Sequence, residues 1–234
     1  NFLKADINYI ILILDTMHSN KGITQKIFTP DLEEFYKKIL KLIITNKKIG
    51  CIIKSKKPSV LKKLPSIKNS INILTKENRC YEVQNSQGAK ANDYASMSDL
   101  SVAIQPTLPA SLYESLLKSK KALLFDYGNL QNFENELYKK GKDKIIFNNL
   151  EKFIEVLKEL IKNPKDNSNL GNWKSLLYEI DPYHDNLGDK RIGFYLSQLI
   201  ISFKNEKNKD EAIEYANTQY KKKWGNEMVS INKL

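Results

Sequence analysis

The feature that most constrains the fold is a regular alternation of short apolar runs and segments with helical periodicity. Residues 8–14 form the run NYIILIL, which is typical of a parallel strand that is covered on both faces. Residues 31–45 follow with apolar side chains at helical spacing and with acidic side chains in the first turn, where a helix favours negative charge. This alternation predicts an α/β fold, a parallel sheet with helices on both faces.

The same two patterns continue along the chain. Further strands are predicted at 49–53, 71–74, 100–104, 122–125 and 145–147, and further helices at 60–67, 92–97, 111–119, 150–162, 190–203 and 210–224. The helix over 60–67 is expected to break at Pro65, because proline disrupts a helix interior. In a parallel sheet the loops after the strands lead into helix starts, and ligands bind there. The functional residues are therefore expected in those loops.

The composition argues against nucleic acid as a partner. The net charge is +11, but of the 38 basic residues only Arg79 and Arg191 are arginines. Nucleic-acid surfaces rely on arginine for bidentate contacts, so this chain predicts a solvated lysine-rich surface. Such a surface attracts phosphorylated substrates or acidic lipid headgroups.

Location and redox state follow from what the sequence lacks. It contains no apolar run long enough to span a bilayer and no secretory leader pattern, which predicts a cytoplasmic protein and leaves open a peripheral contact with the anionic inner face of the membrane. Cys51 and Cys80 lack metal-ligand spacing, and in a cytosolic setting they are expected to be reduced thiols.

The most informative segment is Pro109–Ser115, between two predicted strands. Pro109, Ala110 and Ser111 begin a predicted helix, and the free N–H groups of a helix start form an anion site. Glu114 lies one turn further along. Its carboxylate can accept both hydroxyls of a ribose, or it can act only as a favourable charge at the helix start. The segment therefore indicates a nucleotide-binding loop, with a helix cap as the alternative.

Residues 95–126, ASMSDLSVAIQPTLPASLYESLLKSKKALLFD, resemble the donor site in the C-terminal domain of GT-B-fold glycosyltransferases of the bacterial surface-carbohydrate type. The resemblance implies a Rossmann-like domain that binds a nucleotide sugar. It implies that Glu114 binds the ribose, that Ser111 and the Ala110 backbone lie near the diphosphate, and that Ser115 belongs to the same pocket. Family members often have glycine after this helix, where this chain has Ser119-Lys120.

A second stretch, residues 173–195, is similar to a segment found near the C-terminus of GT-B-type proteins of surface-carbohydrate biosynthesis. The matching residues are Asp181, Pro182, Asp185, Arg191, Ile192 and Gly193. His184 stands where the family has arginine and Asn186 where it has glycine. Asp185 and Arg191 are expected to clamp each other or to hold a ligand.

Three other loops carry candidate side chains. Lys54 and Lys56 follow the strand at 49–53, where they can neutralise a pyrophosphate, although lysine is abundant throughout the chain. His18 follows the first strand and is a candidate base or phosphate ligand, with an incidental loop histidine as the alternative. Asp126 follows the strand at 122–125. His18 and Asp126 are the candidate catalytic residues.

The resemblance and these loops together predict the donor half of a glycosyltransferase for surface polysaccharide or lipopolysaccharide. Fixed cations and N–H groups would stabilise the departing nucleotide, and no cofactor or metal is expected because the chain has no D-x-D or HExxH motif. The acceptor would be a glycan or a lipid-linked sugar.

The predicted domains are 1–206, Rossmann-like, and 207–234, a helical extension, with the acceptor domain outside this chain. The chain is therefore expected to bind the donor and to be inactive as an isolated fragment. Two alternatives remain: a nucleotide-sugar epimerase of the same architecture, and a non-catalytic scaffold with a basic binding face.

Overall fold

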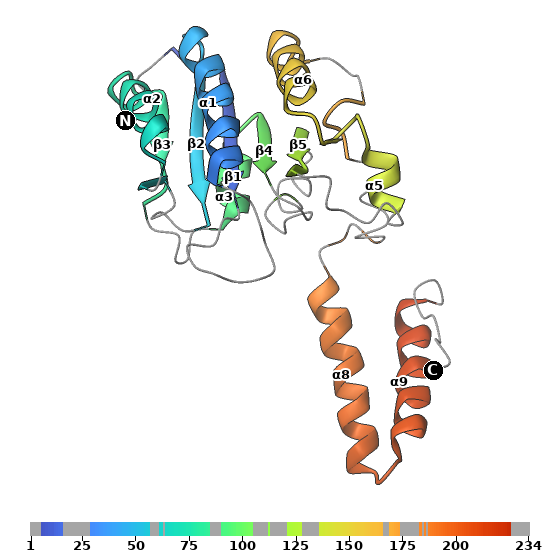
Figure 1. Cartoon of the computed structure of the whole chain (residues 1–234). Coiled ribbons are helices and arrows are strands. Elements are labelled where there is room, and N and C mark those ends of the chain that lie inside the picture. Colours follow the sequence, from blue (N-terminus) through green and yellow to red (C-terminus); the bar gives the residue numbers. More distant parts are fainter. Residues whose placement is uncertain are drawn as a thin grey trace. The chain divides into compact units, whose positions relative to one another are not determined.

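The computed structural model divides into two compact units, which are described separately. They are the sheet unit, Asn1–Ile180, and the helical unit, Asp181–Leu234, whereas the sequence predicted a boundary after residue 206 (Figure 1). The described residues are 6–15, 29–56, 61–62, 64–84, 90–104, 112, 121–127, 136–165, 169–173, 183, 185 and 187–225.

A parallel sheet forms the centre of the sheet unit. Its strands are β1 (Tyr9–Asp15), β2 (Ile49–Ser55), β3 (Cys80–Glu82), β4 (Leu100–Ile104), β5 (Lys121–Phe125) and β6 (Ile146–Phe147). Among the described residues the six strands lie in the order β3-β2-β1-β4-β5-β6, and every neighbouring pair is parallel. β2 and β3 thus extend the sheet on one side of β1, and the chain then crosses over so that β4 pairs with the other side of β1. The predicted α/β class with a parallel sheet is confirmed.

Helices cover both faces of this sheet, because successive side chains of each strand point to opposite faces. In β1, Ile11 and Ile13 belong to one apolar core, and Leu12 and Leu14 belong to the other. The first core also takes side chains from α1 (Thr29–Thr45), α2 (Pro65–Lys76) and α6 (Leu150–Lys162). The second takes them from α3 (Ala91–Ser96) and α5 (Glu136–Gly141) and includes Trp173.

One part of the expected secondary structure was wrong. Pro65 does not break a helix but stands in the first turn of α2, where a missing N–H costs nothing. Residues 71–74, predicted as a strand, belong to this same helix. Ile67, Ile71 and Leu74 are its buried side chains, and their spacing of four and three residues is that of a helix face.

A buried arginine closes the C-terminal end of α1, whose last turn contains no basic residue. The Arg79 side chain donates from Nη1 to three backbone carbonyl oxygens, those of Ile43 at 2.7 Å, Asn46 at 2.9 Å and Ile49 at 2.9 Å. Its Nε and Nη2 donate to Glu77 Oε2 at 2.8 and 2.6 Å. Arg79 therefore satisfies the Ile43 carbonyl that the helix end leaves unpaired, binds the turn between α1 and β2, and offsets the negative end of the helix dipole.

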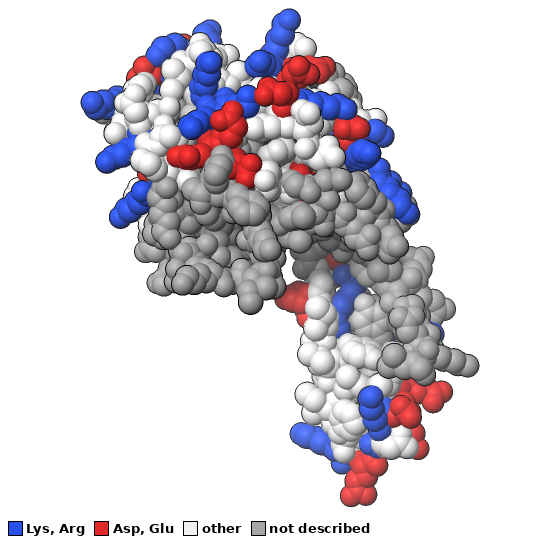
Figure 2. Space-filling model, viewed as in Figure 1, with Lys and Arg blue, Asp and Glu red and all other residues white. Residues whose placement is uncertain are grey.

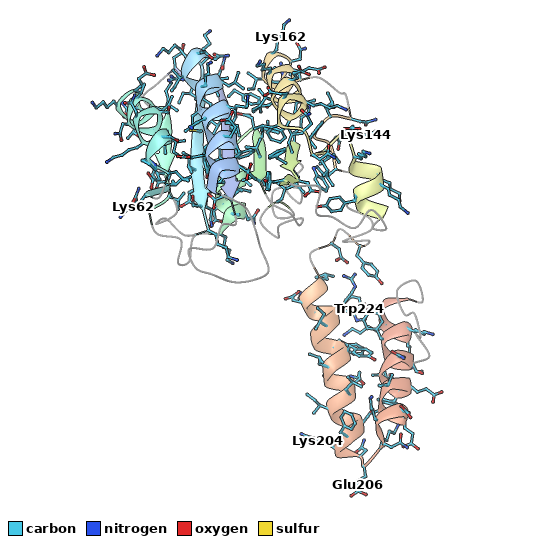
Figure 3. The ribbon with its side chains drawn as sticks, viewed as in Figure 1. Lys62, Lys144, Lys162, Lys204, Glu206 and Trp224 are labelled. Atoms are coloured by element: carbon cyan, nitrogen blue, oxygen red, sulfur yellow. The ribbon has the colours of Figure 1, made fainter. Side chains whose placement is uncertain are left out.

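The helical unit contains α8 (Gly188–Lys204) and α9 (Lys209–Trp224), which pack against each other. Arg191 donates from Nη1 and Nη2 to the two carboxylate oxygens of Asp185. Its guanidinium carbon also lies 3.6 Å from the Tyr183 ring centroid and 4.8 Å from that of Trp224, near the start of α8 (Figure 3). Of the two predicted roles, Asp185 and Arg191 clamp each other.

Charges of both signs are spread over the surface. Figure 2 shows lysines and carboxylates interleaved on the visible described face of the sheet unit, with no field of one sign. This pattern fits the solvated lysine-rich surface that the composition predicts. None of the described helices combines the length and apolar character needed to cross a bilayer.

Candidate functional site

The candidate site lies where the strand order reverses, between β1 and β4. Asp15 is the last residue of β1, and it pairs in register with Ser55 of β2 on one side and with Ile104 of β4 on the other. In open α/β sheets, ligands bind outside the carboxyl ends of the strands at such a switch point. The polar side chains at this edge are therefore the ones to consider.

A buried carboxylate stands at this edge. Asp15 is only 4% exposed, and its Oδ2 accepts hydrogen bonds from the Tyr36 hydroxyl at 2.6 Å and the Ser55 hydroxyl at 2.7 Å. The Lys56 N–H donates to the Asp15 carbonyl oxygen at 3.2 Å. Burial, followed by the Asp15 charge, raises the pKa of Tyr36 well above its ordinary value, so its hydroxyl keeps the proton that it donates. We call Asp15, Tyr36 and Ser55 the carboxylate cluster.

A second tyrosine ties the start of α1 to the same edge of the sheet. Tyr127 follows β5 by two residues, and a hydrogen bond with Asp31 in the first turn of α1 raises its pKa. Asp126, between Phe125 and Tyr127, is 2% exposed, and its N–H donates to the Phe147 carbonyl oxygen at 2.8 Å. The N-terminal half of α1 is thus attached near the carboxyl ends of both β1 and β5.

The other described candidates lie at the same edge. Lys54 is half-buried opposite Leu14 in the register of β1 and β2, and Lys56 is exposed one residue past β2. Strand alternation places Lys54 on the face of the sheet to which Leu14 points. Leu112, the described residue of Pro109–Ser115, is buried in the same core as Leu14. Lys54 and Leu112 therefore share one face of the sheet.

Several predicted site residues lie outside the described residues. They are His18, Ala110, Ser111, Glu114 and Ser115. Their roles stay predictions. The carboxylate cluster, by contrast, was not predicted as a unit. The signal for it was weak: Asp15 and Ser55 are polar residues that close two apolar runs, and Tyr36 stands among the apolar residues of a helix face.

The described part of the chain contains no group of three or more histidine, cysteine or acidic side chains that could hold a metal ion. Cys51 and Cys80 lie opposite each other on β2 and β3, and both thiols are free and buried. The contact with Cys80, followed by burial, raises the pKa of Cys51. A protonated, buried thiol is unreactive, which suits a place in the core.

Comparisons with known proteins bear on the fold. No protein-family model and no curated protein sequence matches the chain. Among solved structures, the S. aureus MnaA–UDP co-structure matches with a TM-score of 0.54 at 16% identity, over 83% of this chain and 47% of that one. The crystal structure of a putative UDP-N-acetylglucosamine 2-epimerase from Listeria monocytogenes matches with a TM-score of 0.52 at 14% identity, over 86% of this chain and 46% of that one.

The chain therefore spans about half the length of these two proteins. A third structure, the C-terminal CMP-Kdo-binding domain of WaaA from Acinetobacter baumannii, matches with a TM-score of 0.47 at 9% identity, over 68% of this chain and 83% of that one, which is too distant to carry an argument. The likeness to the first two confirms the Rossmann-like, GT-B-type fold implied by the resemblance. Fold does not determine activity.

Proposed function

We propose that this chain is the nucleotide-sugar-binding domain of a GT-B-type enzyme, a glycosyltransferase of surface polysaccharide or lipopolysaccharide synthesis. The observation that carries the proposal is that β4, which borders the switch point of the sheet, ends at Ile104, five residues before Pro109 in the sequence. The two similar structures support it, since one is a UDP co-structure and the other is a putative UDP-N-acetylglucosamine 2-epimerase.

In this proposal the nucleotide is held by groups from two loops. Glu114 accepts the ribose hydroxyls, and Ser111, Ser115 and the Ala110 N–H contact the diphosphate. Lys54 and Lys56 lie at the end of β2, the strand next to β1, and they reduce the charge of the diphosphate. Donors and cations that are already in place stabilise the nucleotide as it departs with its negative charge.

The remaining groups are assigned to the sugar side of the reaction. His18 follows β1 and Asp126 follows β5, so both chain positions leave the carboxyl edge of the sheet. His18 is proposed as the base or phosphate ligand. Asp126 is proposed as the second catalytic residue. Because its side chain is buried, this role requires that a bound sugar approach the end of β5. A glycan or lipid-linked acceptor would occupy the space beyond the donor, and the lysines would favour an anionic membrane surface.

An epimerase is the second candidate, and the Listeria monocytogenes structure is the observation that favours it. The two activities differ in their products from the same donor. A transferase releases free nucleotide only when an acceptor is present, whereas an epimerase changes the sugar and keeps it attached to the nucleotide. Chromatography of the products, with and without a lipid-linked acceptor, separates the two activities.

Calorimetric titration with UDP-, CMP- and GDP-linked sugars tests donor binding. We expect Glu114→Gln to weaken the binding of the preferred donor by about 10-fold or more, because hydrogen bonds to a charged carboxylate are lost. Glu155→Gln is the matched control, since Glu155 is an exposed glutamate of α6. An unchanged affinity of Glu114→Gln would leave Glu114 as a helix cap, and a wild-type protein that binds none of the donors would refute the proposal.

A further inference from the structure

The carboxylate cluster has a geometry that stability alone does not require. Its three members come from three elements, β1, α1 and β2, and both hydroxyls donate to the same oxygen of Asp15. A buried charge carries a desolvation cost, and apolar side chains of similar volume are often as stabilising as a buried polar group with its partners. The cluster is therefore suited to fixing one arrangement of the three elements.

That arrangement determines where two loops begin. Asp15 is the last residue of β1 and Ser55 the last residue of β2, so the segments that carry His18 and Lys56 start directly after them. The Lys56 N–H also donates to the Asp15 carbonyl oxygen at 3.2 Å. Any shift of the Asp15 side chain or backbone is therefore passed to both loop starts.

Tyr36 is held in place independently of Asp15. It is fully buried in the first core, and its ring lies edge-on to Phe35 with centroids 5.9 Å apart. The start of α1 is attached through Asp31 to Tyr127, beyond β5. Packing thus fixes the Tyr36 hydroxyl, and its hydrogen bond in turn fixes the Asp15 carboxylate. A preorganised site needs side chains that are held by packing and hydrogen bonds in this way.

We propose that Tyr36 and Ser55 are positioning residues for the nucleotide-sugar site, acting through the Asp15 carboxylate. This inference rests on the function proposed above. When one of these hydroxyls is removed, Asp15 Oδ2 loses that donor, and the position of the carboxylate at the ends of β1 and β2 is less tightly fixed. Displacements of about 1 Å in a supporting shell can cost 100-fold in function, so even a small relaxation is measurable.

The chain offers a matched control in Tyr9. It belongs to the same apolar core as Tyr36 and is 5% exposed, but it stands at the first residue of β1, at the opposite end of the strand from Asp15. Burial, followed by the charge of Asp99, raises the pKa of Tyr9, so it too is a neutral phenol. Tyr9→Phe therefore removes a buried hydroxyl from the same core without touching the carboxyl edge.

The experiment compares Tyr36→Phe, Ser55→Ala and Tyr9→Phe by calorimetric titration with the donor that the wild type prefers, and by thermal unfolding in parallel. We expect Tyr36→Phe and Ser55→Ala each to weaken binding by about 5-fold or more, and Tyr9→Phe to stay within about 2-fold of wild type. The double variant should lose less than the product of the single losses, because both hydroxyls act through one carboxylate.

The outcomes separate the two proposals. If the wild type binds a donor, and Tyr36→Phe and Ser55→Ala bind as well as Tyr9→Phe, then the positioning role is refuted and the proposed function stands. If the wild type binds no donor, both are refuted. Should Tyr36→Phe fail to fold, Ser55→Ala decides, because it removes only a hydroxyl and leaves the Tyr36 contact with Asp15 in place.

Discussion

The buried cap on α1 gives the most demanding test of the fold. Replacing Arg79 with methionine keeps an unbranched side chain but removes every donor from a position that is 2% exposed. The carbonyl oxygens of Ile43 and Ile49, which accept buried hydrogen bonds from Arg79, then lose that donor. The last turn of α1 contains no basic residue of its own, and the change removes the cation that contacts this turn at the Ile43 carbonyl oxygen.

The size of the effect follows from these contacts. Hydrogen bonds to charged groups contribute about 1.5–3 kcal/mol each, and a buried carbonyl oxygen that loses its donor costs about 1–3 kcal/mol. We take about 4 kcal/mol for Arg79→Met, which corresponds to a fall in melting temperature of about 10 °C for a unit of this size. The ion pair with Glu77 adds little, since that carboxylate is partly exposed.

Urea denaturation followed by circular dichroism measures the loss in free energy of unfolding. Arg79→Lys should lie between wild type and Arg79→Met, because a lysine keeps the charge but cannot reach three carbonyls at once. Lys47→Met is the control: Lys47 also pairs with Glu77, but its side chain is 67% exposed, so we expect a change within about 0.5 kcal/mol. A loss below about 1 kcal/mol for Arg79→Met would refute the account of the cap.

Two further predictions concern other parts of the chain. The hydrogen bonds from Arg191 lower the pKa of Asp185 to about 2, below the unfolded value of about 4, so the pair stabilises the helical unit at higher pH and this contribution is lost as the pH falls from about 4 to about 2. The fluorescence of Trp224, whose ring contacts Arg191, should change over the same pH range. If Asp185→Asn shows the same pH-dependent change in fluorescence, the titrating group is not Asp185. Gly171 has a φ of +68°, and an added Cβ would lie 3.2 Å from the Lys121 Cβ. Gly171→Ala should therefore cost about 1–3 kcal/mol in thermal unfolding, and an unchanged melting temperature would show that the loop can adapt.

The sequence predicted most of the sheet because its strands are apolar runs buried on both faces. β1, β2, β4 and β5 were all found this way, and helix α6 was predicted at the bounds that it has. β3 was missed because it is only three residues long, with Cys80 buried and Tyr81 exposed. The segment around Ile71 was assigned to a strand because a short apolar run does not distinguish a strand from one turn of a helix.

The site was harder to predict than the fold, because its contacts join residues distant in the sequence. Asp15 meets Tyr36 and Ser55 only after α1 has packed on the sheet and β2 has paired with β1. A tyrosine on a helix face predicts burial, but the sequence does not show which group its hydroxyl will reach. The place of Lys54 near the end of β2 and of Asp126 just after β5 could be predicted from local order alone, whereas their roles in a site stay predictions.

The return of the chain from β3 to β4 also affects how the protein folds. β2 follows β1 after α1, so the two strands can pair as soon as β2 has been made, whereas the other edge of β1 has no partner in the sheet until the residues of β4 have been made. Non-local strand pairing is slow, and an open edge rich in isoleucine and leucine can recruit another chain in the meantime. During synthesis the N-terminal strands form first, so the most aggregation-prone intermediate should be a sheet of β1, β2 and β3 that awaits β4. The crossover that places the candidate site between β1 and β4 thus also leaves one edge of β1 open while the chain is being made.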